Sequence, residues 1–190
     1  MRKKRKKKQM YSAIEKKPNG FENPRQFAKR WRRNIRHSYQ RVKYGYCDRD
    51  VWSIDWWALN VVPNMLEDLR DTTHSYPVEF ANSHNVKKVN DKEEPDAGAQ
   101  KWDAVLREMI HLFREANMET CSIKNPYQKE FDKYLMKNYD LEKGIQHENK
   151  EYDAFTKLYL EEEAKICEYR EKCKNKALAL FSKWFWDLWD

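Results

Sequence analysis

Apolar side chains recur every three or four residues through most of this chain, and only four glycines interrupt the pattern. That spacing places apolar residues along one face of an α-helix. Strands joined by tight turns need more Gly and Pro than the chain supplies. The 8 Trp and the 36% charged residues fit helices with bulky inner seams and charged outer faces. The 190 residues therefore predict one all-α, bundle-like domain of about five helices.

The first predicted helix has clear signals at both ends. Asn23-Pro24 places a capping residue before a proline at the first helical position, and Gly45 can close the helix. A stripe of apolar residues runs along it, which we expect to face the core: Phe27, Trp31, Ile35, Tyr39 and Val42.

The second predicted helix spans 48–71 and has an unusually wide apolar face, which indicates a central position in the bundle. Asp48 is its expected N-cap. Pro63 lies inside it and removes one backbone donor, so we expect a kink there.

The remainder divides into one loop and three helices. Residues 78–100 show no helical period and predict a mobile loop, with a short extended piece near residues 78–80 as an alternative. Asn125-Pro126 repeats the cap-plus-proline signal of the first helix. The three helices are expected around 102–116, from 125 to about 138, and from about 148 to the C-terminal end.

Positive charge is concentrated at the N-terminal end of the chain. Residues 2–8 hold seven Lys and Arg side chains, which equal the formal net charge of +7. Up to residue 45 the chain has 17 basic residues against two acids, whereas residues 46–190 have 21 against 29. We therefore predict a flexible basic arm over 1–22, attached to an all-α domain over 23–190 whose first helix is also basic.

Clustered Lys and Arg side chains neutralise phosphates and release counterions, so nucleic acid, either DNA or RNA, is the favoured partner. Phosphate contacts carry no base information, so sequence selectivity should be weak. An acidic protein and an anionic membrane surface remain as alternatives; the arm lacks the Trp and Leu residues that a membrane helix needs. Trp31 could stack on an unpaired base, although its stripe favours the core. The predicted binding residues are Arg2, Lys3, Lys4, Arg5, Lys6, Lys7, Lys8, Arg25, Lys29, Arg32, Arg33 and Arg36.

One acidic and one basic residue interrupt apolar faces. Asp55 falls in the middle of the apolar face of the second helix, and Arg170 lies in the seam of the last helix. A buried charge needs a partner, so we predict that Asp55 is neutralised by Arg170 or by an arginine of the first helix. A catalytic or metal-binding role for Asp55 is the less favoured alternative.

Acidic residues at helical spacing raise the question of a metal site. Glu67, Asp68 and Asp71 could hold magnesium, as helix-borne carboxylates do in nucleotide hydrolases, but no matching pair stands on a neighbouring stripe. Glu108 and Glu115 are expected on the outer side of their helix. A solvated acidic face is the favoured interpretation, and we predict neither a metal nor another cofactor.

The four cysteines predict no disulfide framework, because they are far apart in the sequence and no two of them form a C-x-x-C pair. No apolar run is long enough to cross a membrane. Trp186 falls opposite the expected packing side of the last helix, which makes it a candidate contact for a protein partner or a second copy.

Three stretches resemble a group of small uncharacterised bacteriophage proteins: YGYCDRDVWSIDWWALNVVPNMLEDLRDTTHSYP, KWDAVLREMIHLFREA and KALALFSKWFWDLWD. The resemblance lies in a G-[YF]-[SC]-x-x-D-x-[WY]-x-x-D centre and an L-F-x-x-[WY]-F-x-x-L-W-D end. It implies expression in the cytoplasm of an infected bacterium, and it assigns no site residue. The basic arm lies outside the matched stretches.

The sequence thus favours a non-enzymatic phage protein that associates with nucleic acid through its basic arm and Arg-rich first helix. A structural or protein-interaction component, of the virion or bound to a host factor, is the alternative. A metal-dependent nucleotide hydrolase that uses the carboxylates at 67, 68 and 71 is the third hypothesis.

Overall fold

The structure is a computed structural model that describes residues 15, 23–81, 97–140, 144–145 and 150–189. The predictions for the arm, apart from Glu15, and for residues 82–96 of the loop lie outside the described residues. Residues 97–100, which were predicted to belong to the loop, are helical, so that prediction is wrong for them. The described segments are almost entirely helical, which confirms the all-α prediction. In chain order the elements are α1 (Pro24–Tyr44), α2 (Asp48–Val51), α3 (Ile54–Thr72), η1 (Val78–Phe80), α4 (Ala97–Ala116), α5 (Gln128–Asn138), β1 (Tyr139–Asp140), β2 (Gly144–Ile145), α6 (Lys150–Lys183) and η2 (Phe185–Asp187).

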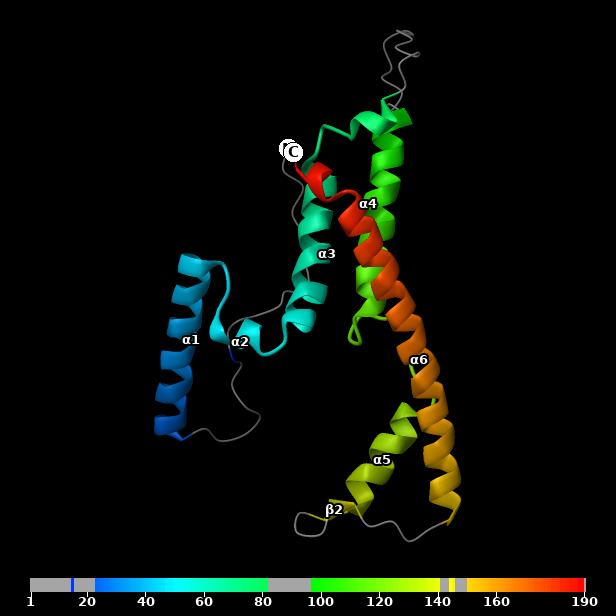
Figure 1. Ribbon diagram of the computed structural model, residues 1–190. Helices are drawn as coiled ribbons and strands as arrows, with labels where there is room; N and C mark the ends of the chain where they lie inside the picture. Colours follow the sequence, from blue (N-terminus) through cyan, green and yellow to red (C-terminus); the bar gives the residue numbers. More distant parts are fainter. Residues whose placement is uncertain (1–14, 16–22, 82–96, 141–143, 146–149, 190) are drawn as a thin grey trace.

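The core lies where α4 packs against both α3 and α6 (Figure 1). The apolar stripe of α4 supplies most of it, as the 3.6-residue period of that segment predicts. The buried residues of this cluster are Leu66, Trp102, Leu106, Met109, Ile110, Leu112, Phe113, Ala116, Cys173, Ala177 and Trp184.

Aromatic rings close one end of this core. The rings of Trp102 and Trp184 meet edge to face with centroids 5.6 Å apart, and the ring of Phe80 lies 5.0 Å from that of Trp184. Phe80 belongs to η1, a short 3₁₀ turn, so the extended piece suggested for these residues is wrong. The turn brings Phe80 onto the two tryptophans and so joins the chain after α3 to the core.

Both predicted ends of α1 are confirmed. The side chain of Asn23 accepts a hydrogen bond from the backbone N–H of Arg25 at 2.9 Å, and Gln26 completes a capping box. Gly45 ends the helix with φ at 80°, a left-handed conformation in which a Cβ atom would be strained.

The prediction that the apolar stripe of α1 faces the core is wrong. Its five residues, from Phe27 to Val42, are all exposed, and no residue of α1 belongs to the core cluster. The main contact of α1 is with α2, and Figure 1 shows α1 standing apart from α3, α4 and α6. Amphipathic spacing identifies an apolar face but does not determine what covers it.

The predicted second helix is divided in two. The backbone of Ser53, at φ −149° and ψ 71°, leaves the helical path between α2 and α3, and Cys47 rather than Asp48 is the N-cap. Pro63, where we expected a kink, is buried within the continuous helix α3. The wide apolar face predicted for one helix is therefore divided between two helices, α2 and α3, that do not share one axis.

The short helix α5 packs on the N-terminal half of α6 (Figure 1). It begins at Gln128, two residues later than the proline signal suggests, and ends at Asn138 as predicted. The rings of Phe131 and Tyr159 stack with centroids 4.0 Å apart, and the amide of buried Asn125 donates to the carbonyl of Tyr159 at 3.0 Å. Strands β1 and β2 form a two-residue antiparallel pair after α5.

Candidate nucleic-acid interface

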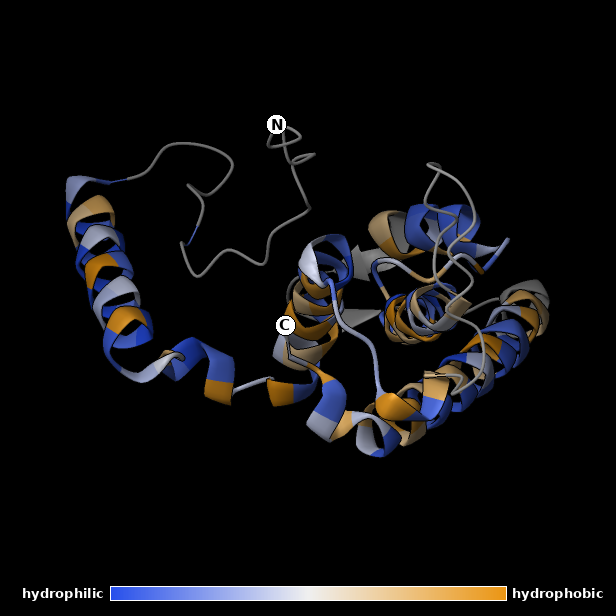
Figure 2. Ribbon diagram, turned by 90° about the horizontal axis from the view of Figure 1, so that it is seen from above, coloured by the Kyte–Doolittle hydropathy of each residue, from blue (hydrophilic) through white to orange (hydrophobic). Residues whose placement is uncertain are grey.

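Helix α1 carries eight Lys and Arg side chains and no acidic residue. Arg25, Lys29, Arg32 and Arg36 follow one another at spacings of three or four residues, which places them on one side of the helix. We call these four residues the basic face. They are all exposed, on a helix that lies to one side of the molecule and joins it through α2 (Figure 2).

Three members of the basic face carry unneutralised charge within the described part of the chain. Arg25, Lys29 and Arg32 make no ion pair there, whereas Arg36 pairs with Asp48 at 2.8 Å. Both partners of that pair are more than half exposed, and exposed ion pairs contribute little to stability. A phosphate group can therefore replace the carboxylate of Asp48 at small cost.

Arg33, the fifth predicted residue of α1, faces a different group. Its guanidinium donates to both carboxylate oxygens of Glu15, with the shortest contact at 2.7 Å. The hydrogen bond from Arg33 lowers the pKa of Glu15 below its ordinary value. Arg30 and Asn34 also donate to the carbonyl of Glu15, so this side of α1 holds a carboxylate already.

A third side of α1 is docked on α2 through a buried ion pair that the sequence analysis missed. Asp50 is 4% exposed and accepts hydrogen bonds from the Nε of Arg41 at 3.1 Å and from the backbone N–H of Cys47 at 2.8 Å. His37 is buried on the same helix as Arg41. The signal for this contact was the position of Asp50, three residues after the N-cap, where an acidic side chain completes a capping box.

Asp50→Ala is expected to release α1 from α2 without unfolding the core. The change leaves the partly buried Arg41 without its carboxylate and removes a bond to the cap of α2, a loss of about 2 kcal/mol. Hydrogen exchange should show the amides of α1 exchanging about 30-fold faster, with the amides of α4 unchanged.

Asp48→Ala is the matched control, because it removes the exposed ion pair of the same helix. Its effect on exchange should stay within about threefold. Equal exchange rates in the Asp50 and Asp48 variants would contradict a docking role for Asp50.

The predicted burial of Asp55 and its pairing with Arg170 are wrong. Asp55 is exposed in the first turn of α3, where a carboxylate is favoured by the helix dipole. Arg170 donates its Nε to the carbonyl of Ala116 at 3.1 Å and so satisfies the last residue of α4. Asp55 shares a helical face with Leu59, Val62 and Leu66, but it lies one turn before Leu59, where the contacts of this face with the core begin.

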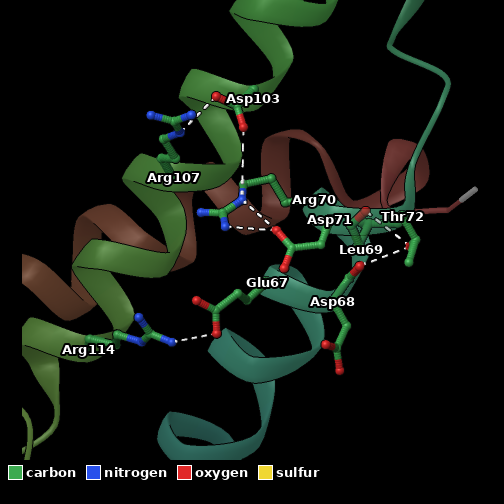
Figure 3. Close-up of polar contacts among 9 residues, drawn as sticks. All are labelled: Glu67, Asp68, Leu69, Arg70, Asp71, Thr72, Asp103, Arg107 and Arg114. Carbon is green, nitrogen blue, oxygen red and sulfur yellow. Dashed lines mark hydrogen bonds and ion pairs between the residues drawn. The ribbon is translucent and has the colours of Figure 1, made fainter. Parts of the chain in front are cut away.

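Two of the three carboxylates considered for magnesium, those of Glu67 and Asp71, belong to an ion-pair network between α3 and α4 (Figure 3). Glu67 accepts from Arg114 at 2.8 Å, and Asp71 accepts from Arg70 at 2.8 Å. Arg70 also lies 3.9 Å from Asp103 of α4. Within the described residues, no group of three or more His, Cys, Asp and Glu side chains is placed to hold a metal ion. The guanidinium groups of Arg114 and Arg70 lie against the carboxylates of Glu67 and Asp71, where a bound cation would have to lie.

Glu115 is buried, so the prediction that it lies on the outer side of α4 is wrong, whereas Glu108 is exposed as predicted. The carboxylate of Glu115 accepts hydrogen bonds from the hydroxyl of Ser122 at 2.7 Å, from the backbone N–H of Ser122 and from the hydroxyl of Tyr169 at 3.0 Å. Burial alone would raise the pKa of Glu115, but the bonds from Ser122 and Tyr169 outweigh it and lower the pKa below 4.5.

The C-terminal aromatics divide between the core and the surface. Trp184 is buried, while Trp186 is 84% exposed as its position on the helical wheel predicts. Phe185, which follows Trp184, is half exposed because α6 ends at Lys183 and η2 turns the chain.

No family model matches the sequence, and no curated protein and no solved structure matches the chain. Within the described segments, no helix is both long enough and apolar enough to cross a membrane. The charges and exposed surfaces described above are therefore the basis on which a function can be argued.

Proposed function

We propose that this chain is a non-enzymatic phage protein that associates with nucleic acid through the basic residues 2–8 of its arm and the basic face of α1. The observation that carries the proposal is the exposed basic face on a helix without a single acidic residue. The resemblance to bacteriophage proteins supports the phage assignment and the cytoplasm of an infected bacterium as the place of action.

The geometry of α1 suits a phosphate backbone. From Arg25 to Arg36 the basic face extends for about 16 Å, at 1.5 Å per residue. Charges placed along one line contact successive phosphates without reading bases, so binding should be strong at low salt and weakly selective for sequence. The chain that follows α1 has more acids than bases, which directs a polyanion to the N-terminal end.

Repulsion within α1 also favours a polyanion. Arg25 and Lys29 are four residues apart, as are Arg32 and Arg36, and like charges at this spacing destabilise a helix by about 0.2–0.5 kcal/mol per pair. Intrahelical acids do not offset this repulsion, because α1 has none. Phosphates along the basic face would relieve it, so binding should also stabilise the helix.

The salt dependence of binding tests the proposal. Changing Arg25, Lys29 and Arg32 together to alanine removes three phosphate contacts. The slope of log affinity against log salt should fall by up to ~2.7 for a DNA duplex, at ~0.9 per contact. Deleting residues 2–8 should lower the slope by several units. Fluorescence anisotropy of a labelled 20-base-pair duplex between 50 and 300 mM salt measures both changes.

A charge-matched control separates a defined site from overall charge. Lys101, Lys129 and Lys176 are exposed on α4, α5 and α6, and changing all three to alanine removes the same charge. This control should leave the slope nearly unchanged. A control slope that falls as much as that of the α1 variant, or a wild-type protein that does not bind the duplex, would overturn the proposal.

A protein-interaction role is the second candidate, and exposed aromatics at the C-terminal end favour it. Trp186 and Trp189 are largely exposed, and Phe185 is half exposed beside them. Neighbouring aromatic side chains of this kind commonly anchor protein contacts. Size-exclusion mass of the wild type and of Trp186→Ala tests self-association through this end: a dimer lost in the variant would support it, and identical monomers would exclude it.

A further inference from the structure

Helix α1 presents a second exposed surface beside its basic face. Phe27, Trp31 and Tyr39 follow one another at multiples of four residues and are 46%, 53% and 60% exposed. We call these three residues the aromatic row. Ile35 and Val42 lie on the same side and are exposed as well. A helix inside a bundle would bury such a row, whereas α1 keeps it at the surface.

Trp31 is the free ring of this row. Phe27 has the guanidinium of Arg30 at 5.4 Å from its ring centroid, and Tyr39 has the ammonium of Lys43 at 5.8 Å. Among the described residues, Trp31 makes no ring contact, cation–π contact or hydrogen bond. Its indole is thus a large aromatic surface, half exposed at the middle of the row.

The aromatic row and the basic face of α1 meet at Tyr39, whereas Trp31 lies about 100° and Phe27 about 140° from Arg32 around the helix axis. On a helical wheel, at 100° per residue, Arg32 is the member of the basic face nearest to the row, and Tyr39 is the ring nearest to Arg32. A groove or edge that combines cations for the backbone with aromatic rings for the bases is the usual design for single-stranded nucleic acid. In a duplex the base faces are already stacked on one another and only base edges are accessible.

We propose that α1 binds single-stranded nucleic acid, with phosphates along the basic face and an unpaired base stacked on Trp31. This inference rests on the proposed function and names the class of nucleic acid. Along the helix axis Phe27 and Trp31 are about 6 Å apart and Trp31 and Tyr39 about 12 Å apart, so each ring meets a separate base. Stacking requires only an aromatic face, so the interaction is tolerant of sequence.

A second copy of α1 is a weaker occupant of the row. Two such helices would bring sixteen basic side chains together with no acid on either helix to offset them. A nucleic-acid strand supplies the opposite charge and the aromatic faces at once. Charge complementarity therefore favours the strand over a paired helix.

The experiment compares one position on single-stranded and double-stranded probes with the full-length protein. Fluorescein-labelled dT20, rU20 and a 20-base-pair duplex are titrated with the wild type and with Trp31→Leu, which keeps an apolar side chain but cannot stack. We expect the variant to bind dT20 or rU20 about 5- to 100-fold more weakly, the range measured for loss of one stacked base. Its affinity for the duplex should stay within about twofold.

Two further variants keep the test specific. Trp31→Phe retains an aromatic face and should recover most of the lost affinity. Trp186→Leu removes an exposed tryptophan outside α1 and should change nothing. Because both tryptophans are exposed, the variants should retain the wild-type circular dichroism. The difference between dT20 and rU20 decides between DNA and RNA.

The outcomes distinguish failure of this inference from failure of the proposed function. Equal affinity of wild type and Trp31→Leu for dT20 and rU20 overturns single-strand stacking and leaves duplex binding intact. Absence of binding to all three probes overturns the proposed function itself. Two other outcomes would also overturn the inference, because they assign the aromatic row to another occupant. One is a wild-type dimer that the Trp31→Leu change dissociates. The other is binding of the wild type to vesicles of anionic phospholipid that is lost in Trp31→Leu and in no other variant.

Discussion

Glu115→Leu is expected to lower the free energy of unfolding by about 3 kcal/mol. Leucine fits the buried volume but accepts no hydrogen bond. The backbone N–H and hydroxyl of Ser122 and the hydroxyl of Tyr169 would lose their shared acceptor, a carboxylate on a side chain that is buried. Ser122 lies in the loop after α4, and Tyr169 belongs to α6. Loss of the Glu115 carboxylate therefore loosens the attachment of that loop to α4 and α6. Urea denaturation followed by circular dichroism measures the change.

Glu115 also makes stability depend on pH. Its pKa is lowered in the folded state, so its contribution is complete above the ordinary value of 4.5 and is lost as the pH falls through the lower folded value. Wild-type stability should therefore decrease below about pH 4.5 more steeply than that of Glu115→Leu. The matched control is Glu108→Leu, at an exposed position of the same helix, which should change stability by less than about 0.5 kcal/mol. Equal stability of the two variants at pH 7 would contradict a buried role for Glu115.

Trp102→Ala is expected to lower the free energy of unfolding by about 3–5 kcal/mol. Its ring is 2% exposed and meets Trp184 and Phe80, so alanine leaves a cavity where α4, η1 and the end of α6 converge. Near-ultraviolet circular dichroism should also lose the signal of the packed aromatic pair. Trp52→Ala removes the same side chain from a position that is 90% exposed, and it should shift the urea midpoint very little. A comparable shift in both variants would contradict the assigned core.

Local signals in the sequence predicted most of the helices. Asn23-Pro24 and Gly45 define the ends of α1 through hydrogen bonds within a few residues. The apolar stripe of α4 is likewise a local pattern, and it predicts that helix. The break between α2 and α3 was missed because Trp52 and Ser53 are compatible with a helix. Such breaks depend on how the flanking helices pack, which a single-sequence pattern does not contain.

The candidate site was predictable in its charges but not in its surroundings. The basic face follows from spacing alone, whereas the exposure of Trp31 depends on the separation of α1 from the core. Glu115 was misplaced because its donors, Ser122 and Tyr169, are brought to it by tertiary structure. Periodicity ranks the faces of a helix by polarity, and it gives no information about distant partners that make a buried carboxylate stable.

The absence of α1 from the core cluster has a consequence for the evolution of the chain. Substitutions on its basic face or aromatic row change an exposed surface while leaving the packing of α3, α4 and α6 untouched. The stripe of α4 has no such freedom, because every change there alters the stability of the whole domain. The surface of α1 can therefore change without repacking the core, and α1 should diverge faster than α4 among related chains.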